Sequence, residues 1–540
     1  MFGRRAKDQG DASSASRANL EPVVISLEDE EEPRPKVSAL RVLGAAVLIG
    51  GGSYAGFLGV SSTLQSKEAG HASAWFAPYV DVTLTPTDQF QVASADPARQ
   101  SVLGFIVAAG PKSCRPTWGA AYSLPRANQA LALSSRLVQM ERDGAQPIIS
   151  FGGAKHTSLA VACTSATSLA GAYESVVNAY GVHVVDLDIE GPALNSYAAE
   201  RRRAAALRLV QRAAAQQHRS LNIWLTLPVE PSGLQGNALS VVSSMLRDRV
   251  RIAGINVMAM DFSHSPSEGQ TMSSLVDEAL SSTHAQLTHL LPRYGVRMSP
   301  SAVWHHLGVT VMIGQNNVAG QRFGVSAARA LRSFVLSHHM ARVSMWSLNR
   351  DQPCGSNFPV DVLSNTCSGT SQSSLEFTRI FGQLTGSAYT SSVHQDAVLQ
   401  SPPPVTNPAN APFPLWNGTA SYSAGYKVVR DGQIYQAKWY ASPGEDPAAQ
   451  YQYSWQSPWE LLGPVLKTDH APTIPPPPSG SYPNWSEATP YAAGAEVLYQ
   501  GLPYRAKWAN QGSPPGAVGT QSASTPWVPL YSYPGEPAPT

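Results

Sequence analysis

The chain has 540 residues, of which 43% are apolar, and its charge is nearly balanced, with 38 Lys and Arg against 37 Asp and Glu. This length exceeds one ordinary domain, and the apolar fraction is sufficient for a large core. No basic stripe is visible, so the sequence gives no electrostatic reason to expect nucleic acid as a partner. No Cys lies in a CxxC pair or near a His at zinc-ligand spacing, so we expect no metal and no cofactor.

The N-terminal region predicts a membrane anchor. Val42–Val60 is an uncharged run of about nineteen residues, just long enough to cross a bilayer. Arg34, Lys36 and Arg41 precede it, so the positive-inside tendency places residues 1–41 in the cytoplasm as a polar, disordered tail. We therefore expect a single-pass protein of the cell membrane with its remaining residues outside. A cleaved signal peptide, which would make the protein secreted, and a buried core helix are the alternatives.

The central region, residues 74–390, alternates apolar, β-branched runs with amphipathic helical stretches. The runs are continuously apolar, as in a parallel sheet covered by helices. Eight such units predict an α/β fold, a (β/α)8 or TIM barrel, with a doubly wound open sheet as the competitor. The expected strands are Trp75–Thr83, Val102–Ala109, Pro147–Gly153, Val182–Glu190, Leu221–Pro228, Ile252–Met260, Leu307–Gln315 and Val343–Asn349.

The C-terminal region contains a duplicated unit. Residues 391–411 and 467–481 are rich in proline and predict extended linkers. Residues 412–466 and 482–540, which follow them, each predict a small all-β module. Eight positions of the first module recur in the second at one constant offset, which identifies an internal duplication. The matched residues are Trp416, Tyr422, Gly425, Val428, Gly432, Tyr435, Ala437 and Trp439, then Trp485, Tyr491, Gly494, Val497, Gly501, Tyr504, Ala506 and Trp508.

The four cysteines favour two disulfides, because an even count is typical of an exported protein. Three pairings are possible. We favour Cys114 with Cys163 and Cys354 with Cys367, since each pair would join segments near the same end of the barrel. Four buried thiols are the alternative if the protein is cytosolic.

The fourth expected strand carries three acids at alternate positions. Alternate residues of a strand share one face, so Asp186, Asp188 and Glu190 point together into the barrel. Like charges this close raise at least one pKa, and a raised carboxyl pKa suits a general acid. Glu190 lies nearest the C-terminal end of the strand, where barrel active sites lie. A buried acid network that only supports the fold is the alternative.

These acids and three other segments resemble glycoside hydrolase family 18, the chitinase family. His183–Glu190 is similar to its D-x-x-D-x-D-x-E signature, and Ser150–Gly153 to its S-x-G-G motif. Met258–Phe262 is similar to its M-x-[YM]-D segment, and Trp346 matches the Trp that floors its sugar subsite. The four features fall in the family's order on the third, fourth, sixth and eighth expected strands.

The resemblance implies a chitinase with a substrate-assisted retaining mechanism, an exception to the two-carboxylate scheme. It assigns Glu190 as the acid that protonates the leaving oxygen, Asp188 as the residue that orients the substrate's N-acetyl group, and Asp186 as its buried support. The implied substrate-binding residues are Trp346, Asp261, Met258, Gln315 and Ser150. The alternatives are a hydrolase of another N-acetylglucosamine glycan, such as peptidoglycan, and a non-catalytic chitin-binding protein of the cell surface.

Two positions depart from the family pattern. His183 replaces the first acid of the signature, and we interpret it as a structural residue that makes a hydrogen bond. Met260 stands where many relatives have a Tyr that holds the acetamido oxygen. Gln315 and Asn317 are the candidates to replace that Tyr.

The duplicated units resemble chitin-binding modules of the family 5/12 type, through Y-x-x-G-x-x-V followed by A-x-W. In such modules exposed aromatic rings stack on the apolar faces of sugars. The expected partner is therefore chitin or a chito-oligosaccharide, bound by a monomer. The candidate contact residues are Trp416, Tyr435, Trp439, Tyr440, Trp485, Tyr504 and Trp508, with Trp455 and Trp459 as further alternatives.

Overall fold

The computed structural model describes residues 74–84, 88–91, 100–359, 362–388, 411–451, 456–471, 480, 482–499, 502–515 and 526–530. The expected cytoplasmic tail, the apolar segment Val42–Val60, most of both proline-rich linkers and Trp455 lie outside these residues. Within the described part of the chain, no helix combines the length and the apolar character needed to cross a bilayer.

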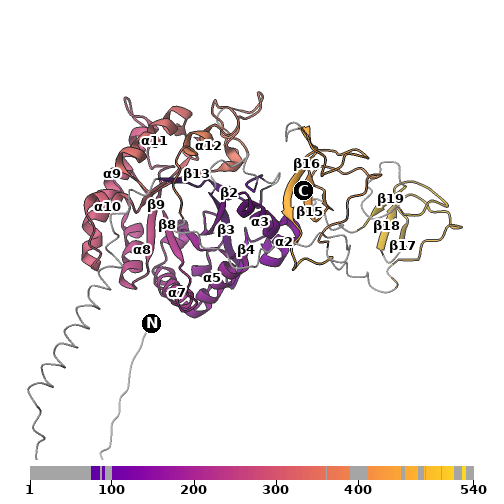
Figure 1. Ribbon diagram of the computed structural model, residues 1–540, viewed down its shortest axis with the longest axis horizontal. Coiled ribbons are helices and arrows are strands. Elements are labelled where there is room, and N and C mark those ends of the chain that lie inside the picture. Colours follow the sequence, from indigo (N-terminus) through magenta and orange to yellow (C-terminus); the bar gives the residue numbers. More distant parts are fainter. Residues whose placement is uncertain are drawn as a thin grey trace, which may run out of the picture. The chain divides into compact units, whose positions relative to one another are not determined.

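The central region is a closed barrel of eight parallel strands (Figure 1). Its first strand is split into β1 (Trp75–Phe76), which pairs with the last strand, and β2 (Tyr79–Asp81), which pairs with the second. Pairing on both sides closes the sheet, so the predicted barrel is confirmed and the open doubly wound sheet is excluded. The other strands are β3 (Gln100–Gly110), β6 (Gln146–Gly152), β7 (Val184–Asp188), β8 (Asn222–Pro228), β9 (Ile252–Met258), β10 (Leu307–Met312) and β13 (Arg342–Trp346).

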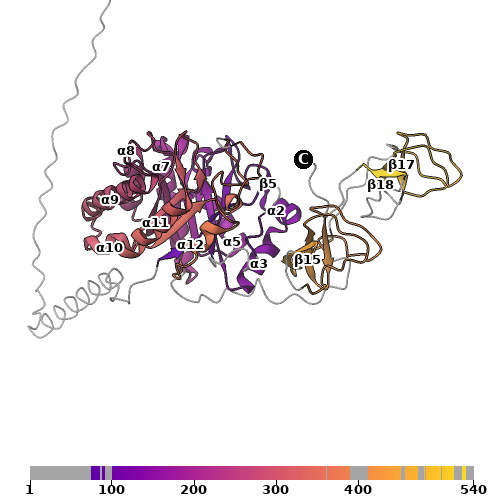
Figure 2. The same ribbon diagram turned by 90° about the horizontal axis from the view of Figure 1, so that it is seen from above.

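Helices cover the outside of the barrel (Figures 1 and 2). The longer ones bury one stripe of their surface against the strands, as amphipathic helices do; in α7 this stripe includes Ala199, Leu207 and Val210. The longer helices are α3 (Leu133–Arg142), α5 (Ala166–Tyr180), α7 (Tyr197–Gln216), α8 (Gly236–Arg247), α9 (Met272–Leu290) and α11 (Val325–His338). The shorter ones are α2 (Leu124–Leu131), α4 (Leu159–Ala162), α6 (Gly191–Leu194), α10 (Pro300–Trp304), α12 (Glu376–Phe381) and the 3-10 turns η1 (Leu291–Tyr294) and η2 (Leu348–Arg350).

Two strand pairs and both disulfides stabilise the rim where the parallel strands end. β4 (Ser113–Trp118) and β5 (Tyr122–Ser123) continue antiparallel from β3, and β11 (Gly314–Gln315) pairs with β12 (Arg322–Phe323). Cys114 of β4 is bonded to Cys163, which follows α4. Cys354 and Cys367 are bonded within the segment after β13. Both predicted pairings are therefore confirmed.

Glycines inside the barrel make room for two large side chains. A Cβ at Gly254 would lie 2.3 Å from the ring of Trp224, and one at Gly308 would lie 2.9 Å from the Cβ of Arg342. Only glycine therefore lets Trp224 and Arg342 lie in the interior beneath the acids of β7.

Each duplicated unit folds as a three-stranded antiparallel sheet, so the predicted all-β modules are confirmed. The first contains β14 (Lys427–Arg430), β15 (Gln433–Ala437) and β16 (Trp459–Pro464); the second contains β17 (Glu496–Tyr499), β18 (Leu502–Ala506) and β19 (Trp527–Pro529). The same bond stabilises both cores, because the indole Nε1 of Trp459 donates to Glu445 O at 2.8 Å and that of Trp527 donates to Ser513 O at 2.7 Å.

The first module packs against the barrel through β16. Gly463 has a φ of 145°, and a Cβ there would lie 2.1 Å from the carbonyl oxygen of Ser135 in α3. The contact is continuous with a buried apolar cluster that contains Ala132, Ala411, Phe413, Val429, Ile434, Leu462 and Val465. The first module is therefore attached to the barrel by side-chain packing as well as by the chain that joins them.

Candidate active site

Asp186 is the centre of a buried hydrogen-bond network inside the barrel. Its Oδ2 accepts bonds from Tyr79 Oη at 2.8 Å and Ser150 Oγ at 2.7 Å. Its Oδ1 accepts from Thr226 Oγ1 and forms an ion pair with Arg342 Nη1, both at 2.7 Å. Arg342 and Asp186 are both fully buried. Three hydroxyl donors and the buried Arg342 cation occupy both carboxylate oxygens of Asp186, which makes it a support rather than a group free to contact substrate.

The two glycines of the Ser150–Gly153 motif allow the end of β6 to approach Asp188. At Gly152, with φ of 114°, a Cβ would lie 1.9 Å from the carbonyl oxygen of Asp188. At Gly153, with φ of 87°, it would lie 3.0 Å from the ring of Phe105. Both backbone conformations favour glycine. The motif therefore shapes the wall of the site, while Ser150 itself is fully buried and donates to Asp186.

Asp188 and Glu190 form a coupled pair of carboxyls above Asp186. Burial raises the pKa of Asp188 well above its usual value, and the charges of Glu190 and Asp186 raise it further, while Arg342 acts in the opposite direction. Burial also raises the pKa of Glu190; a hydrogen bond from Asp188 opposes this shift, and the charge of Asp261 adds to it. Because both pKa values are raised, the pair retains a proton toward neutral pH, as a general acid requires.

One oxygen of this pair has no partner. Asp188 is 6% exposed, and its Oδ1 is buried and accepts no hydrogen bond from the described residues. This oxygen can therefore accept a hydrogen bond from an N–H or O–H donor of a bound ligand.

Asp261 is positioned by the loop after β10. It has a φ of 50°, and both of its carboxylate oxygens accept bonds from Asn317, Oδ1 from the backbone N at 2.7 Å and Oδ2 from Nδ2 at 2.6 Å. The side chain of Gln315 is hydrogen-bonded to other groups. Its Oε1 accepts a hydrogen bond from Arg322 Nη2 at 3.1 Å, and its Nε2 donates one to Asn316 O at 3.1 Å. Of the two candidates to replace the Tyr at Met260, Asn317 is the one that contacts Asp261, and its Nδ2 already donates to that residue.

Trp346 ends β13 at the mouth of the site and is half-buried. Its ring stacks on Phe105 with centroids 5.6 Å apart, and Tyr79 lies 6.3 Å away. Sequence reasoning missed Phe105, Tyr79 and Arg342. The signal that could have been noticed is Arg342 itself, a charged residue directly before the expected strand Val343–Asn349, because an arginine buried there would require an acid.

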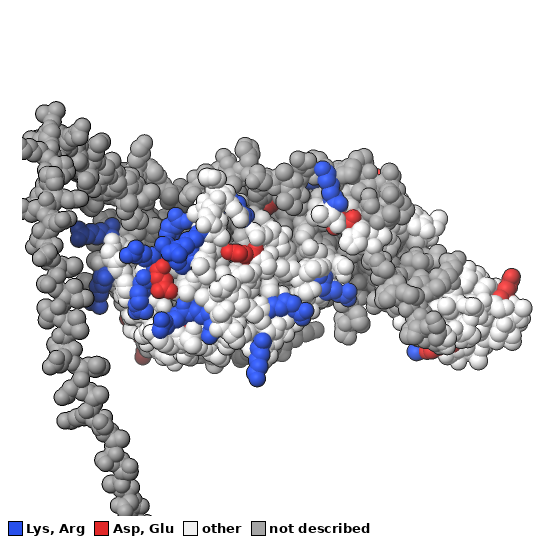
Figure 3. Space-filling view, turned by 90° about the horizontal axis from the view of Figure 1, so that it is seen from below, with Lys and Arg blue, Asp and Glu red and all other residues white. Residues whose placement is uncertain are grey.

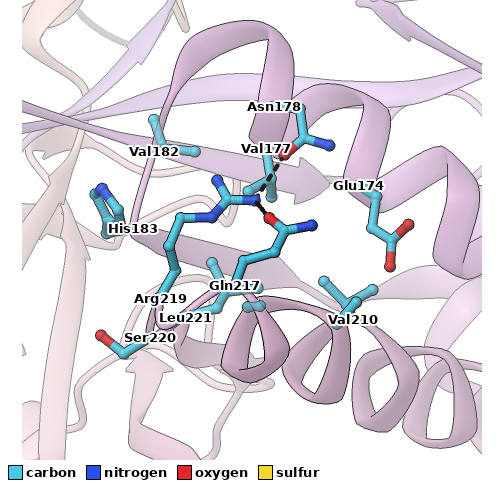
Figure 4. Close-up of a pocket in the computed structure, with 12 residues that line it drawn as sticks. Glu174, Val177, Asn178, Val182, His183, Val210, Gln217, Arg219, Ser220 and Leu221 are labelled. Carbon is cyan, nitrogen blue, oxygen red and sulfur yellow. Dashed lines mark hydrogen bonds between the residues drawn. The ribbon is translucent and has the colours of Figure 1, made fainter. Parts of the chain in front are cut away.

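The remaining predicted positions lie around or away from the acids. Met258 ends β9 and is half-buried, as is Met260. His183 precedes β7 at its opposite end and lines a cavity of about 50 Å³ between α5 and α7, next to Arg219 (Figure 4). His183 is therefore distant from the reacting groups. Among the described residues, no group of three or more His, Cys, Asp or Glu could hold a metal ion.

The module aromatics divide into core and surface. Trp439 and Trp508 are each 44% exposed, and Tyr440 is 60% exposed. Lys438 lies 4.7 Å from the Trp439 ring, and Lys507 lies 4.8 Å from that of Trp508. Three further candidates, Trp416, Tyr435 and Trp485, are half-buried. Tyr504, Trp459 and Trp527 are buried in the module cores, which removes them from any surface that contacts a ligand.

Comparison with known proteins gives two curated relatives and a set of solved structures, whereas no family model matches the chain. Over 289 residues, 52% of the chain, it is 32% identical to a probable bifunctional chitinase/lysozyme of Escherichia coli (strain K12), 31% of which is covered. It is 31% identical over 285 residues to endochitinase 11 of Metarhizium anisopliae, covering 52% of each chain. The catalytic domain of a hyperthermophilic chitinase from Pyrococcus furiosus gives a TM-score of 0.50 at 24% identity, covering 58% of this chain and 97% of that domain.

The barrel is therefore similar to chitinases in sequence and to a chitinase catalytic domain in fold. The chain spans about a third of the length of one curated relative and about half of the other.

Proposed function

We propose that the protein belongs to glycoside hydrolase family 18 and hydrolyses β-1,4-linked N-acetylglucosamine polymers such as chitin, by a substrate-assisted retaining mechanism. The observation that carries this proposal is the unpartnered Oδ1 of Asp188 beside Glu190. An acetamido group presents an N–H donor and a carbonyl oxygen on the same substituent, so it can satisfy Asp188 while its oxygen reaches the anomeric carbon.

In the first step Glu190 donates its proton to the glycosidic oxygen, and the bond from that oxygen to the anomeric carbon breaks. The acetamido oxygen of the same sugar forms a new bond to the anomeric carbon, giving an oxazolinium ion. Asp188 accepts a hydrogen bond from the acetamido N–H and stabilises the positive charge that develops on the oxazolinium ring. Glu190 supplies this proton near neutral pH because its pKa is raised.

In the second step water attacks the anomeric carbon, and Glu190, now a carboxylate, takes its proton. The acetamido group is regenerated, and the product keeps its original anomeric configuration. Asp186 remains bonded to Arg342 throughout. Its fixed negative charge raises the pKa of Asp188, which favours a shared proton in the resting site.

The two C-terminal modules are proposed as chitin-binding modules of the family 5/12 type. Exposed Trp439, Tyr440 and Trp508 provide rings for stacking on sugar faces. Val42–Val60 is proposed as a membrane anchor that keeps the barrel outside the cell, and the protein is proposed to act as a monomer.

Release of chito-oligosaccharides by wild type, Glu190→Gln and Asp188→Asn tests this proposal. We expect Glu190→Gln to lose on the order of a thousandfold or more in kcat, because Gln cannot donate the proton that the proposed mechanism takes from Glu190. Asp188→Asn should lose kcat while largely keeping oligosaccharide binding, because its contribution is made at the transition state. Hydrolysis by Asp188→Asn at the wild-type rate would contradict the substrate-assisted assignment.

Peptidoglycan is the second candidate substrate, because one curated relative is named a bifunctional chitinase/lysozyme. Purified peptidoglycan digested in parallel with chitin distinguishes the two. Release of soluble fragments from peptidoglycan but not from chitin would identify peptidoglycan as the substrate. If neither polymer is cleaved while the protein still binds chitin, the non-catalytic chitin-binding alternative holds.

A further inference from the structure

The outside of the barrel carries an open hollow lined by arginines. The hollow has a volume of about 440 Å³ and lies between the second half of α7 and the end of α8. Figure 3, which views the barrel from the side where α7 and α8 lie in Figure 1, shows Lys and Arg side chains gathered on this face. The lining residues are Ala205, Arg208, Leu209, Arg212, Arg247, Asp248 and Arg249, which together form the arginine hollow.

The charges of the arginine hollow are not balanced. Four arginines face one acid, Asp248, and none of the four forms an ion pair within the described part of the chain. Arg208 donates from Nη1 to the carbonyl oxygen of Arg249 at 2.9 Å, so a backbone group and not a carboxylate orients it. Arg212, Arg247 and Arg249 are exposed. This accumulation of positive charge contrasts with the whole chain, whose net charge is only +1.

The arginine hollow lies at the opposite end of the barrel from the carboxylates. α7 begins after the C-terminal end of β7, where Glu190 lies, and runs back along the barrel. Arg208 and Arg212 lie in its second half, and Arg247 and Arg249 lie just before β9 begins. A ligand there would therefore leave the proposed active site open.

We propose that the arginine hollow binds a compact ligand that carries two or more phosphate groups. A guanidinium group presents its donors in a planar fork that matches the oxygens of phosphate. A carboxylate would neutralise only one of the charges, whereas a phosphate monoester carries about −1.5 to −2 charges and three acceptor oxygens. A nucleic-acid duplex would require basic residues spread along a stripe, and these arginines converge on a single hollow instead.

Two sources can present such phosphates, a soluble oligophosphate and the headgroup of an anionic lipid. Calorimetric titration of the full chain with tripolyphosphate tests the first. Co-sedimentation with phosphatidylcholine vesicles, with and without cardiolipin, tests the second. We expect saturable binding to tripolyphosphate that weakens as salt is raised; binding to the cardiolipin vesicles in addition would identify a membrane as a source.

The matched variants are two arginine pairs of equal charge. Arg212→Gln/Arg247→Gln removes two exposed arginines of the hollow, and Arg115→Gln/Arg126→Gln removes two exposed arginines elsewhere on the barrel. We expect the first pair to weaken tripolyphosphate binding by about tenfold or more, through loss of charge-assisted hydrogen bonds, and the second to change it by less than about twofold. Asp248→Asn should strengthen binding, because it removes the only acid of the hollow.

Three outcomes would overturn the proposal. They are no saturable binding by the wild type, equal weakening in both arginine pairs, and tighter binding of a DNA duplex that displaces tripolyphosphate. The assays measure binding without turnover, so their result is independent of the proposed hydrolysis. Circular dichroism of each variant separates loss of the site from loss of the fold.

Discussion

The two C-terminal modules are copies of one unit, yet the structure attaches only the first to the barrel by described contacts. Several of the residues that repeat lie in the module cores, such as Tyr422 and Tyr491 or Val428 and Val497. Tyr422 and Tyr491 even make the same bond, in which the hydroxyl accepts from a backbone N–H at 2.8 and 2.7 Å. Repetition therefore conserves the fold of the module.

Two charged residues at the contact with the barrel do not repeat. Glu460 is buried and accepts a bond from Gln91 Nε2 of the barrel at 2.6 Å, and its counterpart in the second module is Val528, which is 38% exposed. Lys427 is also buried, and its counterpart is the half-buried Glu496. Duplication therefore repeated the core of the module, whereas unrepeated side chains such as Glu460 distinguish the copy that contacts the barrel.

Arg136 of α3 completes this contact from the barrel side. It is 1% exposed, donates from Nε to Gln91 Oε1 at 2.9 Å, and lies 4.1 Å from the centroid of the Phe90 ring. The negative charge of Glu460 opposes the lowering of the Arg136 pKa that burial causes. Glu460 and Asp88 both favour the charged form of Arg136, and Glu460 also favours that of Lys427.

Glu460→Ala should give the largest effect. It removes a negative charge that favours the charged forms of buried Arg136 and Lys427, and it removes the acceptor of the Gln91 bond, so we expect a loss of about 3 kcal/mol in the free energy that holds the first module in place. Chemical denaturation followed by tryptophan fluorescence measures it. Val528→Ala, at the matching position of the second module, should change stability by less than about 0.5 kcal/mol. Equal effects in the two modules would remove the distinction between them.

Lys427→Met should stabilise the first module at neutral pH. Burial lowers the pKa of Lys427 to about 8, and repulsion by Arg136 contributes. The unfolded chain keeps this lysine charged up to about pH 10.4, so between these two values the unfolded state binds more protons, and the stability contributed by this position rises with pH.

Thermal unfolding from pH 7 to pH 10 checks this expectation. The advantage of Lys427→Met over wild type should be about 1–3 kcal/mol at pH 7 and should shrink as the pH rises through the lowered pKa. Glu496→Gln, at the matching position of the second module, should show no such trend. An advantage that is constant across this range would contradict a buried, titrating Lys427.

Trp439→Ala and Trp508→Ala test whether the two modules share one binding surface. Each removes a ring that is 44% exposed and has a lysine beside it. We expect each to weaken binding to insoluble chitin by about tenfold, the value of one lost aromatic contact. Depletion of the protein from solution by chitin beads measures the effect. An effect of Trp508→Ala alone would place binding entirely in the second module.

Tyr440→Ala should have the smallest effect. Tyr440 is 60% exposed next to Trp439, whereas Ala509 follows Trp508 in the second module. We expect a loss of about twofold to fivefold in chitin binding, because the adjacent Trp439 ring remains. The reciprocal change, Ala509→Tyr, should strengthen binding by a similar factor; no change in either variant would leave Tyr440 outside the binding surface.

The sequence determined the features that depend on local pattern. Alternation along one strand was enough to place Asp186, Asp188 and Glu190 on one face, and apolar periodicity located the eight strands. The recurrence of aromatic positions identified the duplication without any knowledge of the fold. The two disulfides followed from placing four cysteines near one end of the expected barrel.

The contacts between distant residues became visible in the folded chain alone. The pairing of Asp186 with Arg342, the bond from Asn317 to Asp261 and the contact of Glu460 with Gln91 each join segments far apart in the chain. The arginine hollow was hidden by a balanced total charge, because its residues come from two helices and no local run of sequence contains them. Local periodicity predicts which face of a strand or helix a residue occupies. The partners of that residue across the fold depend on how the strands and helices pack in the closed barrel, because packing brings together segments that are distant in the chain.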